Sequence, residues 1–320
     1  MKRRSFIKKS MLTTAGLGIT APFIKSMAGN AEDNINVGVM GVNGRGDFLA
    51  GAFTSVPGVK VGFICDVDKR ALEKGIHTVF ESAGYKPLGF VDIRKMLEQK
   101  DLDALVIAAP DHWHAPAAIM GCNAGKHVYV EKPCCHNPAE GEILIKASKR
   151  SGMVVQMGNQ RRSHPIYLKG IKELHDGVIG RVYFARGWYA NDRASIGTGK
   201  TAEVPEWLDY DLWQGPAPRR PYRDNLIHYN WHWFWHWGTS ETCNNGTHEM
   251  DVMRWGLNAR YPVKVTSAGG RYRYKDDWET PDTQVVTYDF EDNKTAVWEG
   301  RSCNGINEDG DGRGVVFYGD

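Results

Sequence analysis

The sequence predicts an α/β fold in two parts: a doubly wound parallel sheet at the amino end, then an α/β domain whose open sheet is largely antiparallel. Within residues 34–157, near-continuous apolar runs of strand length alternate with stretches of helical spacing, a pattern typical of strands covered on both faces. Within residues 158–320, one helix is followed by a succession of strand patterns, which favours antiparallel pairing. A chain of 320 residues is long enough to bury two cores.

Five strands are expected in the first part, at INVGVMG, VKVGFICD, DALVIAAP, KHVYVEKP and MVVQMG. Between them, RKMLEQK, APAAIMGCNAGK and NPAEGEILIKASKRSG carry helical spacing. Asn137 is a suitable N-cap for the last of these helices, and Gly152 is a suitable residue to end it. In the second part we expect a helix over residues 165–175, followed by strands at GRVYFARGWYA, PVKVTSAGGRYRY, TQVVTYDFE and KTAVWEGRS. Asp292 and Asn293 predict a turn between the last two strands.

The composition narrows the class of protein. Hydrophobic residues make up 42% of the chain, charged residues make up 24%, and the formal net charge is +2, as in soluble globular domains. Lysine and arginine (40) nearly balance aspartate and glutamate (38), so no nucleic acid partner is expected. The weakly apolar run at residues 11–24 is shorter than a membrane span requires. The six cysteines show no paired spacing, so we expect neither a metal site nor a disulfide framework.

Residues 1–30 predict a twin-arginine export signal. Arg3 and Arg4 are followed by Phe6 and a weakly apolar run, and a small-residue cleavage site ends at Ala28. Because that route carries folded proteins, we expect a periplasmic or otherwise exported protein with a tightly held ligand. A basic amphipathic anchor is the alternative interpretation.

The first strand leads into a glycine-rich turn and a helix start, the context of a dinucleotide-binding fingerprint. Aligned to G-x-G-x-x-G, the glycines are Gly41 and Gly46, whereas Asn43 replaces the middle glycine and Gly44 follows it. Asp66 ends the second strand about 20 residues farther on, where a carboxylate accepts hydrogen bonds from ribose hydroxyls and repels a 2′-phosphate. The pattern predicts NAD as the cofactor, with NADP less favoured. The alternative is that Asp66 is a surface aspartate at a strand end.

Two further strand ends carry polar residues. IAAPDHWHAP places Pro110, Asp111 and His114 after one strand, and VYVEKP places Glu131 and Lys132 after the next. Because ligands bind at the carboxyl ends of strands in open α/β sheets, we expect these residues to face the same cofactor. The histidine pair of the first motif also permits a metal ion, but no acid or cysteine completes a ligand set at suitable spacing.

These motifs, with QMGNQRRSHP and GTHEMD, are similar to those of the glucose-fructose oxidoreductase, inositol dehydrogenase and MocA family of nicotinamide-dependent enzymes. The resemblance implies a Rossmann domain followed by an α/β domain whose open sheet mediates homo-oligomers. It implies that Lys132 lies beside the nicotinamide and that Pro133 follows a cis peptide bond. Such sequences usually continue beyond GVVFYGD, so the chain is expected to be shortened at its carboxyl end. The expected cofactor-binding residues are Gly41, Asn43, Gly44, Arg45, Gly46, Asp66, Pro110, Asp111, His114, Glu131, Lys132 and Asn159.

Lys132 and His248 are the candidate catalytic residues for moving a hydroxyl proton during hydride transfer. A helix is expected to begin near Gly246, with His248 in its first turn and Asp251 one turn later on the same face. The resemblance implies a D-x-x-x-H-x-x-D pattern in which Asn244 stands where sugar-alcohol dehydrogenases carry aspartate. An amide orients a hydroxyl but does not accept its proton, so the acid-base work is expected of His248 or Lys132. A helix-capping role for His248 is the alternative.

An aromatic stretch, YNWHWFWHW at residues 229–237, immediately precedes this helix. In an extended segment, alternation would place its four tryptophans on one side and its histidines on the other. Amphipathic aromatic surfaces suit sugar rings. The expected substrate-binding residues are Gln160, Arg161, Arg162, His232 and His236. Packing within the core or between domains is the alternative role for the stretch.

These expectations combine into one function. The sequence predicts an exported, NAD-dependent oxidoreductase that acts on a sugar, sugar derivative or glycoside, with a tightly bound cofactor that recycles within each turnover. One alternative is an NAD-dependent glycosidase or lyase that uses transient oxidation. The other is a non-catalytic relative that only binds sugar.

Overall fold

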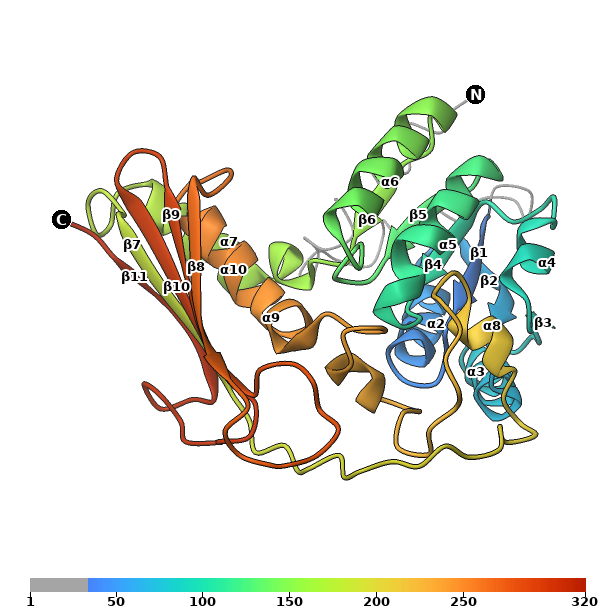
Figure 1. The fold of residues 1–320 in the computed structure, drawn as a ribbon. Coiled ribbons are helices and arrows are strands. Elements are labelled where there is room, and N and C mark those ends of the chain that lie inside the picture. The colour runs from blue at the N-terminus through green and yellow to red at the C-terminus, as the bar shows by residue number, and fades with distance from the viewer. Residues whose placement is uncertain (1–33) are drawn as a thin grey trace.

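A six-stranded parallel sheet forms the amino-terminal half of the protein in the computed structural model, which describes residues 34–320 (Figure 1). The strand order is β3-β2-β1-β4-β5-β6. The strands are β1 (Ile35–Met40), β2 (Val59–Cys65), β3 (Leu88–Phe90), β4 (Ala104–Ile107), β5 (His127–Val130) and β6 (Val155–Met157). The order reverses between β1 and β4, so the carboxyl ends of these strands open a crevice. The predicted twin-arginine signal lies outside the described residues.

Helices cover both faces of this sheet, as the apolar strand runs predict. They are α2 (Arg45–Thr54), α3 (Lys69–Ala83), α4 (Ile93–Leu97), α5 (Asp111–Asn123) and α6 (Pro138–Ser151). One apolar cluster joins the sheet to α2 and α3, and a second joins it to α5 and α6. The Asn137 side chain caps α6 by accepting from the Glu140 N–H, and Gly152 ends that helix in the left-handed region. The short edge strand β3 is absent from the prediction because its exposed residues carry no apolar run.

A five-stranded sheet forms the second part, in the order β11-β7-β10-β9-β8. Its strands are β7 (Phe184–Ala190), β8 (Lys264–Gly270), β9 (Thr283–Phe290), β10 (Lys294–Arg301) and β11 (Arg313–Tyr318). Only β7 and β10 pair in parallel, so the prediction of a largely antiparallel sheet is confirmed. Helices α7 (Pro165–His175) and α10 (Gly246–Gly256) pack on one face. Among the described residues no helix covers the other face (Figure 1).

A long connection, residues 191–239, joins β7 to the short helix α9 (Ser240–Asn244). It leaves the second sheet, reaches the first domain beside α3, and returns (Figure 1); we call it the strap. It contains the helix α8 (Tyr210–Gln214) and the 3-10 turn η4 (Asn230–Trp233), and another 3-10 turn, η3 (Gln160–Ser163), precedes α7. Leu208, Trp213 and Trp237 belong to an apolar cluster built mostly from the strap itself. The strap therefore has a small core of its own.

The prediction that the aromatic stretch is extended is wrong. The chain turns repeatedly there, because the Trp237 and Gly238 amides both donate to the Phe234 carbonyl oxygen. Trp233 is 1% exposed and stacks on Trp278 with 3.9 Å between ring centroids, whereas Trp235 is 56% exposed. The tryptophans therefore share no common face. Packing, the alternative interpretation, accounts for Trp233.

Within residues 34–320, no helix combines the length and the apolar character that a membrane span requires.

Candidate functional site

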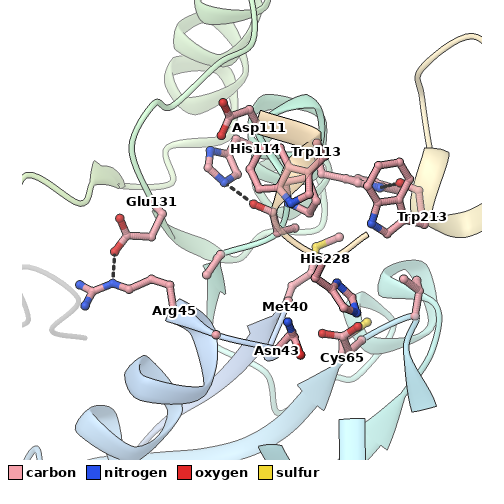
Figure 2. Close-up of a pocket in the computed structure, with 18 of the residues that line it drawn as sticks. Met40, Asn43, Arg45, Cys65, Asp111, Trp113, His114, Glu131, Trp213 and His228 are labelled. Atoms are coloured by element: carbon pink, nitrogen blue, oxygen red, sulfur yellow. Dashed lines mark hydrogen bonds and ion pairs between the residues drawn. The ribbon is translucent and has the colours of Figure 1, made fainter. Parts of the chain in front are cut away.

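One pocket lies at the carboxyl ends of β1, β2, β4 and β5, between the first domain, the strap and the helices α9 and α10. Its volume is about 630 Å³. Figure 2 shows Arg45 joined to Glu131 on one side of this pocket, with Trp213 and His228 on the other. Fourteen of the residues expected from the sequence line it: Gly41, Asn43, Gly44, Arg45, Asp66, Pro110, Asp111, His114, Glu131, Lys132, Gln160, His232, Asn244 and His248.

The glycines of the turn after β1 have different tasks. Gly41 has φ +82°, and a Cβ atom there would lie 2.7 Å from the Ala109 backbone. A Cβ atom on Gly46 would lie 1.9 Å from the Gly41 carbonyl oxygen, so both positions require glycine for packing. A Cβ atom on Gly44 would meet no described atom within 4 Å, and Gly44 lines the pocket beside the first turn of α2. An open cradle at a helix N-terminus fits the pyrophosphate of a dinucleotide.

Asp66 holds the glycine turn to the end of β2. Its Oδ2 accepts a hydrogen bond from the Val42 N–H at 2.7 Å, and its Oδ1 accepts one from the Asp68 N–H at 2.9 Å. Burial raises its pKa, and these backbone hydrogen bonds oppose that rise. Each carboxylate oxygen accepts more than one hydrogen bond, so Asp66 retains acceptor capacity toward the pocket. The site therefore fits a ribose diol at this end.

Lys132 and Asn244 meet across the domain boundary. The Lys132 Nζ donates to the Asn244 backbone oxygen at 2.7 Å and to its Oδ1 at 3.0 Å. Burial lowers the pKa of Lys132, because a buried ammonium loses hydration. The Lys132–Pro133 peptide bond is cis, as the resemblance implies. Lys132 thus faces the pocket from the end of β5, with an amide as its principal partner.

His248 lies in the first turn of α10, which begins at Gly246 as predicted. Burial lowers the pKa of His248 to about 3, with further contributions from the charges of Lys132 and Arg161. The imidazole is therefore neutral at pH 7. A pKa this low makes the His248 imidazole a weak base, whereas the lowered pKa of Lys132 favours its neutral amine, so Lys132 is the better proton acceptor of the two.

Glu131 organises the side of the pocket next to Lys132. It is 4% exposed, and its Oε1 accepts hydrogen bonds from Arg45 Nε at 2.8 Å and Gln160 Nε2 at 3.0 Å. The ion pair ties the start of α2 to the end of β5. Arg45 and Gln160 are thereby held at the pocket wall by one carboxylate.

Most polar side-chain atoms at the start of α5 have hydrogen-bond partners, the buried His112 Nδ1 being an exception. The Asp111 Oδ2 accepts from Thr239 Oγ1 at 2.5 Å. Both ring nitrogens of His114 face carbonyl oxygens, those of Pro133 and Ala109, and the His112 Nε2 lies 2.9 Å from the Trp213 oxygen. Among residues 34–320, no group of three or more histidines, cysteines or acids is arranged to hold a metal ion.

Comparison with known sequences assigns the family. Residues 35–159 match a profile described as the oxidoreductase family, NAD-binding Rossmann fold, and residues 188–310 match the family's C-terminal alpha/beta domain. The chain belongs to the Gfo/Idh/MocA oxidoreductase family. This confirms the expected family and its NAD-binding Rossmann domain.

Curated relatives of this Gfo/Idh/MocA chain are about a quarter to a third identical to it over the segments that align. It is 27% identical to a glycosyl hydrolase family 109 protein of Saccharopolyspora erythraea over 69% of the chain and 55% of that protein. It is 32% identical to glycosyl hydrolase family 109 protein 2 of Shewanella sp. (strain ANA-3) over 59% of the chain and 46% of that protein. The chain thus spans about half the length of the curated relatives it matches.

Solved structures share the fold. GenD2 from gentamicin A biosynthesis, in complex with NAD, matches with a TM-score of 0.68 and 19% identity over 90% of this chain and 70% of that one. The WlbA dehydrogenase from Bordetella pertussis, in complex with NADH and UDP-GlcNAcA, matches with a TM-score of 0.67 and 20% identity over 90% and 76%.

Five of the expected site residues do not line the pocket of this Gfo/Idh/MocA protein. Gly46 packs inside the glycine turn, and Asn159 has a buried Oδ1 with no hydrogen-bond partner among the described residues. Arg161 pairs with the buried Glu249 at 2.8 Å. Two others bond away from the pocket: Arg162 with Asp251 at 2.7 Å and His236 with the Pro218 oxygen at 2.7 Å.

The Asp251 carboxylate therefore forms an ion pair with Arg162. His248 lines the pocket, whereas Asp251 does not.

Several lining residues are absent from the sequence-based expectation. They are aromatic or polar residues of the strap and of α5, among them Trp113, Trp213, His228, Tyr229 and Trp231. Two of them, Tyr229 and Trp231, belong to the aromatic stretch that the sequence makes conspicuous. By contrast, no local pattern indicates that His228 faces Asp68, 160 residues earlier in the chain.

Proposed function

We propose that this protein is an NAD-dependent oxidoreductase that acts on a carbinol of a sugar, sugar derivative or glycoside. The observation that carries the proposal is the meeting of Lys132, Asn244 and His248 at the pocket that the glycine turn and Asp66 also line. One end of this pocket suits a dinucleotide, and the other end supplies groups that bind and move a proton. Membership of the oxidoreductase family supports the same reading.

NAD, when bound, supplies the hydride acceptor for a carbinol carbon. The amide groups at the start of α2 would face its pyrophosphate, and Asp66 would accept hydrogen bonds from its ribose. Lys132 would bind the reacting substrate oxygen, with Asn244 orienting the ammonium or amine. His248, neutral at pH 7, or Lys132 in its neutral form, would accept the hydroxyl proton.

A second candidate outcome is cleavage of a glycosidic bond. It is favoured by the curated relatives, which are named glycosyl hydrolase family 109 proteins. Transient oxidation of a ring carbinol would acidify the neighbouring C–H bond, and a neutral base could then remove that proton while the glycosidic oxygen leaves and takes up a proton. Addition of water to the unsaturated ketone and return of the hydride to the carbonyl carbon would complete the cleavage without net oxidation. The same residues serve both outcomes, which differ in whether reduced cofactor accumulates.

The test combines NADH absorbance and product analysis for a panel of sugars and glycosides. Oxidation predicts one bound NADH per active site when no acceptor substrate is present, whereas cleavage predicts many molecules of released aglycone per active site without net NADH. Lys132→Ala should lower turnover by at least about 10²-fold, the range of general acid-base catalysis, while dinucleotide binding persists. A protein that binds dinucleotide and sugar but converts no member of the panel would contradict the proposal and favour a non-catalytic binding role.

We also propose export and self-association. The arginine pair within residues 1–30 supports export through the twin-arginine route. The uncovered face of the second sheet presents apolar side chains that suit contact with a second copy. They are Phe184, Val285, Val297, Val316 and Tyr318.

A further inference from the structure

We infer that the strap holds NAD in its pocket as a group that does not exchange during turnover, by closing the side of the pocket next to Asp66. The inference rests on the proposed function, because it requires that the pocket bind the dinucleotide. Leu212, Trp213 and His228, all from the strap, line the pocket. Trp213 and His228 lie on the side opposite Arg45 and Glu131 (Figure 2).

The strap is attached to the first domain by its backbone. The Lys69 N–H donates to the Trp207 oxygen at 2.9 Å, and the Asp209 N–H donates to the Val67 oxygen at 3.0 Å. These bonds flank an isolated antiparallel bridge between Asp68 and Leu208. The strap thus pairs like a short strand with the segment that follows β2, immediately beyond Asp66.

A buried carboxylate adds a side-chain attachment at the same place. Asp68 is 1% exposed, and its Oδ2 accepts hydrogen bonds from His228 Nε2 and from Arg70 Nη2, both at 2.8 Å. The Arg70 guanidinium also lies 3.5 Å from the centre of the Trp207 ring. Burial would raise the pKa of Asp68, but the hydrogen bonds from Arg70 and His228 lower it to about 2. The carboxylate is therefore charged at neutral pH and bonds two segments of the chain.

A second attachment joins the last turn of α8 to α5. The Trp213 oxygen lies 2.9 Å from His112 Nε2 and accepts from Trp113 Nε1 at 3.0 Å. The Leu212 oxygen accepts from the same indole at 3.1 Å. A Cβ atom on Gly215 would lie 2.2 Å from the Trp113 ring, so the strap and α5 are in close contact there.

These attachments bracket the lining residues Leu212, Trp213 and His228 on both sides. A dinucleotide whose ribose is bound to Asp66 then has the glycine turn on one side and the strap on the other. Its release on the strap side requires that the bonds to Lys69, Asp68 and α5 break together. Because the strap carries its own apolar cluster, it opens as a unit, and we expect that opening to be slow compared with turnover.

The experiment measures release of bound NADH by its fluorescence after a chase with excess NAD, using the full chain. Wild-type protein should keep its NADH for much longer than the time of one turnover. His228→Ala should release it about tenfold faster, the factor that corresponds to one lost hydrogen bond to a buried charge. His228→Gln, whose amide can still donate to Asp68, should release it at close to the wild-type rate.

Arg219→Ala is the matched control, since Arg219 lies in the strap and its bonds go to Asp211, Gly215 and Ala217 within the strap. Equal release rates for wild type and His228→Ala would overturn the strap inference and leave the proposed function intact. A wild-type protein that binds no dinucleotide would overturn both.

Should His228→Ala fail to fold, hydrogen exchange of the wild-type Lys69 and Asp209 amides serves instead. Loss of NADH while both amides stay protected contradicts the inference, whereas parallel opening and release support it.

Discussion

His248 shows how strongly its surroundings alter an ordinary residue. A free histidine changes charge near pH 6.5, but burial and the charges of Lys132 and Arg161 lower the pKa of His248 to about 3. The neighbouring Lys132 also loses basicity, because its ammonium is buried. Both shifts favour neutral forms of the two groups. Under the proposed function, the lysine rather than the histidine sets how activity depends on pH.

We therefore predict that kcat/KM for substrate oxidation rises with pH through one ionisation below 10.5, the ordinary pKa of lysine. A lowered pKa means that Lys132 becomes neutral at a lower pH than a free lysine, so the base form accumulates earlier. Because His248 stays neutral down to about pH 3, no second ionisation is expected near pH 6.5. A profile from pH 5 to 10 measures both.

Two matched variants distinguish the contribution of Lys132 to the pH profile from that of His248. His248→Gln should lower kcat but leave the pH of the Lys132 ionisation unchanged. Lys132→Arg should remove that ionisation from the profile, since a guanidinium stays charged over this pH range. An ionisation near pH 6.5 that disappears in His248→Gln would show that the imidazole titrates after all.

At the level of elements, the glycine turn and α2 form the part of the site that short-range geometry explains best. The sequence departs from the usual fingerprint by placing Asn43 where a glycine is common. In the structure it is the next residue, Gly44, that leaves open space at the pocket, while Gly46 packs against the Gly41 oxygen. The departure therefore keeps an open backbone facing the pocket.

Gly46→Ala should destabilise the protein by about 1–3 kcal/mol, the cost of overpacking a closed site, and should weaken NAD binding because the turn must move. Gly44→Ala meets no described atom, so its free energy of unfolding should stay close to that of wild type. Urea unfolding and NAD titration of both variants measure the difference. Equal loss of stability in the two would mean that the turn is looser than the packing around Gly46 indicates.

The strap is the element that local patterns describe least well. Alternating aromatic residues predict an extended segment. The position of Trp233 is instead determined by its stacking on Trp278, 45 residues later in the chain. By contrast, α6 begins after Asn137 and ends before Gly152 as those caps predict, because capping hydrogen bonds join residues only a few positions apart. Helix α7 spans the predicted residues 165–175.

For the whole molecule, the uncovered face of the second sheet is the feature with the clearest consequence. Val285 lies on this face, opposite the buried side that Val286 contributes to the core, and is 40% exposed. Val297 lies on the same face of the central strand β10, where it pairs with Thr287 and Arg186. Apolar side chains gathered on one sheet face, here among polar ones such as Thr287 and Arg186, support the proposed contact between subunits.

Under the proposed self-association, replacing both Val285 and Val297 by lysine should convert the oligomer to a monomer, because the added charges would lose their hydration at a subunit contact. Light scattering after size-exclusion chromatography measures the mass. Val56→Lys, in the loop after α2 and 37% exposed, is the matched control and should leave the mass unchanged. A wild-type protein that is monomeric at micromolar concentration would exclude this role for the face.

The order of residues is enough to predict the two kinds of sheet, the helix caps, the glycine turn and the acid after β2, because periodicity, capping and turn geometry act over a few positions. Distant contacts establish the rest. Lys132 meets Asn244 across 112 residues, and His228 meets Asp68 across 160. Burial and electrostatic shifts depend on which residues the folded chain brings together, so the neutral state of His248 and the closure of the pocket by the strap arise only in three dimensions.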